Sequence, residues 1–132
     1  MRERPLSPHL SVYRFKYTLT TSILNRLTGL ALSVALLPLS YWLMAVASGK
    51  HNYEHALQIL SSGVCKLLYA AALFAVCYHT VAGVRHLVWD TGRGLERAQS
   101  ERSAWAVAIV SVLLFIGTAY WLFIAHGAAH GR

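Results

Sequence analysis

Charged side chains are scarce in this 132-residue sequence, since Asp, Glu, Lys and Arg together make up 13% of it and hydrophobic residues 56%. Soluble proteins usually contain roughly 25% charged residues. Three stretches contain no charged residue at all, at 27–49, 67–84 and 103–131. Each is close to or above the ~18–20 residues that a helix needs to cross about 30 Å of hydrocarbon. The sequence therefore predicts an all-α membrane protein with three transmembrane helices, at about 22–48, 63–89 and 104–125.

Acidic residues are the scarcer sign, with 5 Asp and Glu against 12 Lys and Arg and a formal net charge of +7. The basic residues are unevenly distributed around the predicted spans. Nine of the twelve precede or open the first span or flank the connection between the second and third: Arg2, Arg4, Arg14, Lys16, Arg26, Arg85, Arg93, Arg97 and Arg102. By the positive-inside rule, this excess predicts a cytoplasmic N-terminus and an outward-facing C-terminus. It is a topology signal and argues against nucleic acid as a partner.

The polar segments divide the expected structure. Residues 1–21 form a basic and aromatic cytoplasmic lead-in, residues 22–126 the three-helix transmembrane domain, and residues 127–132 an outward-facing tail. The connection at 49–62 contains glycine, asparagine and serine, which are typical of loops. The chain is expected to be a multi-pass protein of the inner (cytoplasmic) membrane.

One histidine, His79, lies deep in the second predicted span. An ionisable group in the hydrocarbon core is costly and usually functional. On a helix, Gly83, His86 and Asp90 fall within about 40° of His79, so a glycine that leaves room for a bulky flat ligand lies one turn away. A neutral imidazole at this depth suits haem iron. The sequence has no Cys-x-x-Cys-His motif, so a haem would be held non-covalently, as haem b.

A plainer alternative is that His79 packs in the bundle and hydrogen-bonds a neighbouring helix. If it does bind haem, a six-coordinate iron needs a second axial ligand. His86 is about 10 Å further along the same helix and cannot reach the opposite face of that iron. The second ligand is therefore expected from a partner subunit. Arg85 and His86 lie nearer the cytoplasmic surface and are candidate contacts for the haem propionates.

A second candidate site lies at the cytoplasmic edge of the first span, where Ser22 and Arg26 are four residues apart and share a helix face. A hydroxyl and a guanidinium side by side form a donor pair for an oxygen-bearing ligand, such as a quinone carbonyl or a haem propionate. The alternative is that Arg26 extends to the interface and Ser22 caps the helix. The spacing alone leaves both interpretations open.

Three motifs and the three-span plan together closely resemble a known family. The motifs are Arg-Pro-Leu-Ser-Pro-His at 4–9, Ser-Ile-Leu-Asn-Arg-Leu-Thr-Gly at 22–29, and His-x3-Gly-Val-Arg-His-Leu-x2-Asp at 79–90. The family is the cytochrome b subunit of succinate dehydrogenase, one of two membrane anchors of respiratory complex II. The resemblance implies packing with a second three-helix anchor. It also implies that His79 is an axial haem ligand and that Ser22 and Arg26 line the quinone site.

The resemblance further implies a role and a set of partners. In this family the two anchors hold one b-type haem, dock an iron–sulfur subunit and a flavoprotein subunit, and pass electrons from succinate to ubiquinone. This chain would then be a non-catalytic subunit of a succinate:quinone oxidoreductase. It departs from the family at Asn25, where a histidine associated with the haem propionates is common; Asn25 can donate a hydrogen bond but carries no charge. Two alternatives stay open: a haem-free structural anchor, and the cytochrome b subunit of another quinone-linked dehydrogenase.

Overall fold

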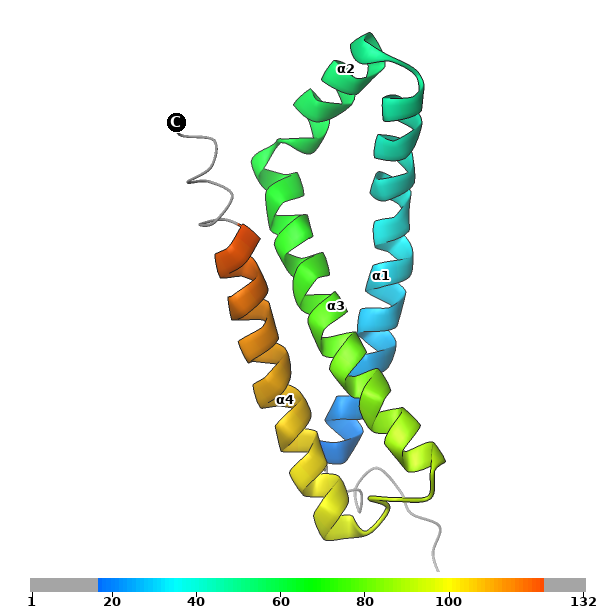
Figure 1. Ribbon diagram of the computed structural model, residues 1–132, viewed down its shortest axis with the longest axis vertical. Helices are drawn as coiled ribbons and strands as arrows, with labels where there is room; N and C mark the ends of the chain where they lie inside the picture. Colours follow the sequence, from blue (N-terminus) through cyan, green and yellow to red (C-terminus); the bar gives the residue numbers. More distant parts are fainter. Residues whose placement is uncertain (1–16, 123–132) are drawn as a thin grey trace, which may run out of the picture.

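The computed structural model describes residues 17–122, and the secondary structure in this range is helical. Its helices are α1 (Tyr17–Ala47), α2 (Lys50–Leu60), α3 (Gly63–Asp90) and α4 (Arg97–Tyr120), shown in Figure 1. By length and composition, α1, α3 and α4 are able to cross a membrane. The prediction of an all-α membrane protein with three spanning helices is therefore confirmed.

The expected loop between the first two spans is instead occupied largely by the helix α2. Gly49, which precedes it, has a φ of 101°, a conformation that glycine adopts without steric cost. Tyr53, Ala56 and Leu60 recur at helical spacing and are buried or half-buried. The opposite side is polar, and Lys50 and Glu54 form an exposed ion pair of 3.8 Å there. α2 is thus a short amphipathic helix that packs against α1 and α3.

α3 begins at Gly63, as expected, whereas the other two spanning helices begin earlier. α1 starts at Tyr17 rather than near 22, and α4 starts at Arg97 rather than near 104. The first turns of α4 are polar, with an exposed contact of 3.7 Å between Arg97 and Glu101. They therefore extend the helix beyond its apolar part. Residues 1–16 of the predicted lead-in (1–21) lie outside the described residues, as do residues 123–132, which include the end of the third predicted span and the tail.

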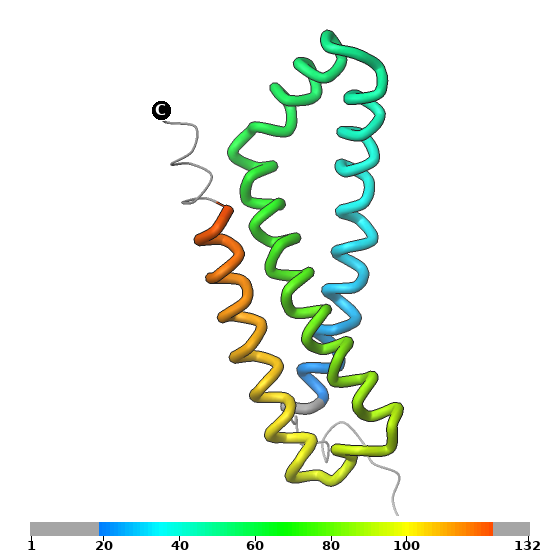
Figure 2. The backbone as a smooth tube through the Cα atoms, in the orientation of Figure 1, coloured from blue at the N-terminus to red at the C-terminus, as the bar shows by residue number. Residues whose placement is uncertain are grey.

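α3 lies between α1 and α4 and contacts both. The smooth trace in Figure 2 follows α1 and α3 as they cross near one end and diverge toward α2. The small core lies on α3 and α4, where Tyr78 and Ala82 pack against Val107. The Tyr78 hydroxyl also donates a hydrogen bond of 3.2 Å to the backbone carbonyl of Thr21 in α1. These contacts join the three spanning helices at the crossing.

Most large apolar side chains face outward. Leu30, Leu37 and Leu67, for example, are 64%, 70% and 72% exposed. An apolar surface of this extent is unfavourable in water and marks contact with lipid or with another protein. The outer surface is therefore that of a membrane protein whose own core is small.

Candidate functional site

The imidazole of His79 contacts one turn of α1. Its Nδ1 atom is 3.1 Å from the backbone carbonyl oxygen of Asn25 and 3.2 Å from Oγ1 of Thr28. A carbonyl oxygen only accepts hydrogen bonds, so Nδ1 carries the proton and Nε2 carries the free lone pair. The ring is therefore held in the tautomer in which Nε2 can ligate a metal, as is usual for histidine ligands whose other nitrogen is hydrogen-bonded.

Two glycines shape the space around this ring. A Cβ added at Gly29 in α1 would lie 3.0 Å from Cε1 of His79, so the absence of a side chain allows the ring to approach the helix. Gly83, one turn after His79 in α3, has no atom within 4 Å of the position that its Cβ would occupy. Gly29 therefore gives close packing, and Gly83 gives open space on the His79 side of α3, where a bulky ligand was expected.

Asn25 contributes more than its backbone carbonyl. Its side-chain Oδ1 is buried and has no hydrogen-bond partner among residues 19–122. A buried polar atom left unpaired costs about 1–3 kcal/mol, and rotation of the amide would present its NH₂ group instead. The position beside His79 therefore has unused capacity to bind a polar group of a ligand or of a partner subunit.

Ser22 lies in α1 just before the segment 25–29 that contacts His79, and Arg26 lies within that segment. Ser22 is half-buried and Arg26 is exposed. Neither side chain forms a hydrogen bond or an ion pair with another residue in the part of the chain that the structure describes. Both donors are thus available on α1, beside the residues that contact the imidazole.

Arg85 is buried, with 9% of its surface exposed, and joins three helices. Its Nη1 donates to Oγ1 of Thr21 in α1 at 3.2 Å, and its Nε donates to Oγ of Ser103 in α4 at 2.9 Å. Nη2 lies 2.9 Å from the carbonyl oxygen and 3.3 Å from Oγ of Ser100. The guanidinium also lies 4.0 Å from the ring centroid of Trp89, a cation–π contact. These bonds make Arg85 the polar junction of α1, α3 and α4.

The propionate contacts that the sequence predicts for Arg85 and His86 stay predictions. A guanidinium has five N–H groups, so the four contacts above leave Arg85 capacity for a further acceptor. No carboxylate of the described residues lies within ion-pair distance of it. His86 is half-buried and packs edge-on against Trp89, with ring centroids 5.3 Å apart. An anionic group at this end of α3 would meet a cation that no described carboxylate neutralises.

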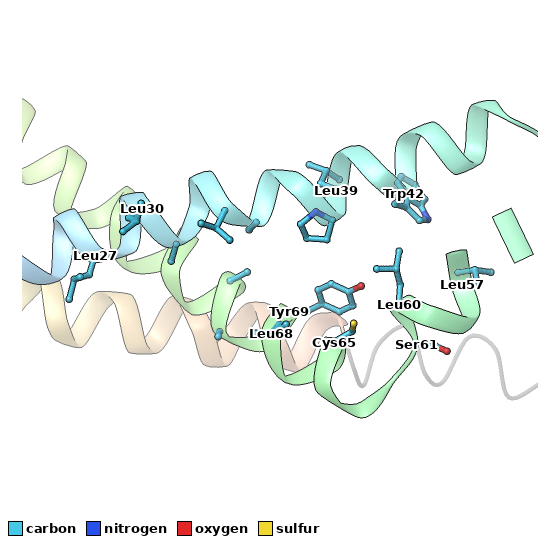
Figure 3. Close-up of a pocket in the computed structure, with 16 residues that line it drawn as sticks. Leu27, Leu30, Leu39, Trp42, Leu57, Leu60, Ser61, Cys65, Leu68 and Tyr69 are labelled. Carbon is cyan, nitrogen blue, oxygen red and sulfur yellow. The ribbon is translucent and has the colours of Figure 1, made fainter. Parts of the chain in front are cut away.

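An apolar cleft of about 900 Å³ opens between α1 and α3, and α2 lies across the end of the cleft where these two helices diverge (Figure 3). It begins on α1 at Leu27, next to Thr28, and includes Ala72 of α3, which is two turns before His79 on the same helix face. Its polar lining is sparse; Figure 3 places Trp42, Ser61 and Tyr69 near α2. The cleft could accept the hydrocarbon part of a membrane ligand or an apolar side of another helix.

The donor set fits an iron held in a porphyrin better than a bare metal ion. No group of three His, Cys, Asp or Glu side chains capable of holding a metal occurs among the described residues. A porphyrin supplies four nitrogen ligands itself and requires only axial ligands from protein. One imidazole with a fixed Nδ1–H, open space at Gly83 and an unpaired amide oxygen at Asn25 are therefore compatible with haem.

Thr28 and Gly29 are contacts of His79 that the sequence alone did not predict. Their spacing from Asn25 places all three residues on neighbouring positions of the α1 surface. Which residue of α3 faces them depends on the rotation and crossing of the two helices, and hydrophobic patterning does not specify this. The sequence offers one signal for these contacts, which is that the hydroxyl residue Thr28 is followed directly by Gly29.

Fold and site together define a class: an all-α membrane protein with three spanning helices and a histidine at the crossing of the first two. Residues 1–118 match the family model described as succinate dehydrogenase/fumarate reductase transmembrane subunit. The chain belongs to this family, which confirms the predicted resemblance to the cytochrome b anchors of complex II. Family membership supports a role as a membrane anchor in succinate dehydrogenase.

Curated relatives come from bacteria and from mitochondria. The succinate dehydrogenase cytochrome b556 subunit of Paracoccus denitrificans is 36% identical over 92% of this chain and 93% of its own length. The b556 subunit of Rickettsia felis is 38% identical over 85% of this chain and 87% of its own length. The mitochondrial cytochrome b560 subunit of Sus scrofa is 40% identical over 88% of this chain and 70% of its own length. The similarity thus covers most of each protein.

Proposed function

We propose that this chain is an electron-transfer anchor of succinate dehydrogenase that binds one b-type haem through His79 and helps form a quinone-reduction site. The observation that carries this proposal is the hydrogen bond of 3.1 Å between Nδ1 of His79 and the Asn25 carbonyl. It assigns the free lone pair to Nε2, for which no described residue is a hydrogen-bond partner. An imidazole nitrogen left unpaired in hydrocarbon would be costly, whereas iron ligation satisfies it. This favours ligation over simple packing.

The other residues of the proposed haem site have distinct roles. When bound, haem would supply a centre that takes up and returns one electron at a time. Gly83 leaves space on the His79 side of α3, while Arg85 and His86 are proposed to contact the propionates at the end of α3. The cytochrome b designations of the relatives support a haem in this chain too. The second axial ligand is proposed to come from a second membrane-anchor subunit, because His79 is the one histidine placed deep in a described span.

Ser22 and Arg26 are proposed to bind ubiquinone. A hydroxyl and a guanidinium N–H donate to a quinone carbonyl, orient it, and stabilise the negative charge that develops on oxygen during reduction. Neither donor is used by another described side chain. Succinate itself would be oxidised on the flavoprotein subunit, with the iron–sulfur subunit between it and the membrane, so this chain is non-catalytic toward succinate.

The proposed orientation places the quinone pair and the iron–sulfur subunit on the cytoplasmic side of the inner (cytoplasmic) membrane. The start of α1, the end of α3 and the start of α4 lie at one end of the structure, and α2 lies at the other (Figure 1). The first end carries most of the described basic residues: Arg26, Arg85, Arg93, Arg97 and Arg102. The α2 end carries Lys50 and Lys66. By the positive-inside rule, this supports a cytoplasmic N-terminus.

Haem content of the purified membrane complex tests the proposal. Extraction of the haem and formation of its pyridine complex should reveal one b-type haem per copy of this chain. A complex without haem would show that the haem-free structural anchor is correct. Two haems per copy would instead favour a cytochrome b of another quinone-linked dehydrogenase.

A further inference from the structure

Thr28 places a hydroxyl group against the imidazole nitrogen that the Asn25 carbonyl also contacts. Its Oγ1 lies 3.2 Å from Nδ1 of His79. The same Oγ1 is 2.8 Å from the carbonyl oxygen of Leu24 and 3.0 Å from that of Asn25, and each of these oxygens can accept its proton. Because a hydroxyl has one proton and two lone pairs, donation within α1 leaves Oγ1 as an acceptor for Nδ1–H.

We propose that Thr28 is a positioning residue for His79, and that its hydroxyl orients the imidazole and increases its electron donation to iron. The inference rests on the proposed function, since it concerns the residue that would ligate haem. Hydrogen bonds to the second nitrogen of a ligating histidine fix its orientation and raise its basicity. A more basic axial ligand stabilises ferric over ferrous iron and so lowers the reduction potential.

The local packing explains why the hydroxyl reaches the ring. Gly29 brings α1 close to the imidazole, because any Cβ there would be 3.0 Å from Cε1 of His79. A threonine in a membrane helix commonly hydrogen-bonds only the preceding turn of its own helix. Thr28 keeps that bond and adds a contact to α3. Its effect on His79 is also separable from the Ser22 and Arg26 pair, since neither of those side chains is bonded to it.

Substitution of Thr28 in the intact membrane complex tests this inference. Thr28→Val keeps the shape but removes the hydroxyl, and Thr28→Ser keeps the hydroxyl. We expect Thr28→Val to retain haem, to shift its midpoint potential to a more positive value, and to change the low-spin electron paramagnetic resonance signal of the ferric form. Thr28→Ser should match the unmodified complex in both measurements.

Thr118→Val is a matched control, because the Thr118 hydroxyl makes the same type of bonds within its own helix. Its Oγ1 is 2.7 Å from the carbonyl oxygen of Leu114 and 3.1 Å from that of Phe115. Its contact outside α4 is with the Cys77 sulfur, at 3.9 Å. Loss of this hydroxyl should therefore leave the haem potential unchanged.

Several results would overturn the role of Thr28. One is a haem midpoint potential and a paramagnetic resonance signal that are unchanged in Thr28→Val. Another is a shift of the haem potential in Thr118→Val that equals the shift in Thr28→Val. If Thr28→Val loses its haem, Thr28→Ser decides: haem retained at the original potential supports the role of the hydroxyl, and haem lost there too contradicts it. A haem retained in His79→Ala would instead overturn the proposed function, so the two failures are distinguishable.

Discussion

At the scale of single residues, the proposed haem site depends on which atoms of α1 touch His79. Nδ1 contacts the carbonyl of Asn25 and the hydroxyl of Thr28, and the ring lies close to Gly29, which has no side chain to displace it. None of these contacts involves a charged group. The chain thus orients the imidazole by hydrogen bonds and close packing.

Gly29→Ala should displace the imidazole. The new methyl group would lie 3.0 Å from Cε1 of His79, and extra atoms in a packed contact cost about 1–3 kcal/mol. We expect reduced haem content or an altered visible spectrum in the purified complex. Gly117→Ala is the control, because no atom lies within 4 Å of the added Cβ. Full haem content with the original spectrum in Gly29→Ala would show that the close approach is unimportant.

Arg26→Ala should impair reduction of ubiquinone more than oxidation of succinate. Loss of one donor that stabilises developing negative charge costs on the order of 10²-fold in rate. The two half-reactions are measured by following succinate oxidation with ubiquinone and with a soluble dye as acceptor. Arg93→Ala is a suitable control, because Arg93 is another exposed basic residue at the same end. Equal losses with both acceptors in Arg26→Ala would argue against a quinone contact.

At the scale of elements, Arg85 holds α1, α3 and α4 together near the end of α3. Arg85→Met should remove its hydrogen bonds and leave polar groups of Thr21, Ser100 and Ser103 without this donor. Hydrogen bonds from a buried charged donor are worth more than neutral ones, so we expect their loss to cost about 2–4 kcal/mol in stability. The measurement is thermal unfolding in detergent. A melting temperature equal to that of Arg93→Ala would contradict the role of Arg85 as a junction.

The length of the three uncharged stretches predicted the three spanning helices, because an apolar stretch of about 18–20 residues or more has few alternatives to a membrane helix. It did not predict α2, whose 11 residues have a mixed composition and follow a glycine. The spacing of Tyr53, Ala56 and Leu60 was the signal available for it. Likewise, His79 could be found from its depth in a span, whereas its contact with Thr28 depends on how α1 and α3 cross. Interhelical rotation of this kind is set by packing rather than by composition.

At the scale of the whole molecule, the large exposed apolar surface and the presence of one deep histidine in the described spans favour a hetero-complex. The chain expressed without the other subunits should not form a stable low-spin haem centre, because the described spans contain no second deep histidine to serve as the other axial ligand. The intact complex should show a low-spin ferric signal in electron paramagnetic resonance, and mass spectrometry should identify a second membrane anchor in it. A low-spin haem bound by the isolated chain would contradict the expected sharing of ligands between subunits.

In the proposed haem site, Nε2 of His79 ligates the iron. The most direct test is the reduced-minus-oxidised spectrum of the purified complex carrying His79→Ala, with haem content measured on the same sample. His55→Ala serves as the control, since His55 is an exposed histidine of α2. We predict that the b-type signal is lost or strongly altered in His79→Ala and unchanged in His55→Ala. An unaltered b-type spectrum with full haem content in His79→Ala would contradict the ligand assignment.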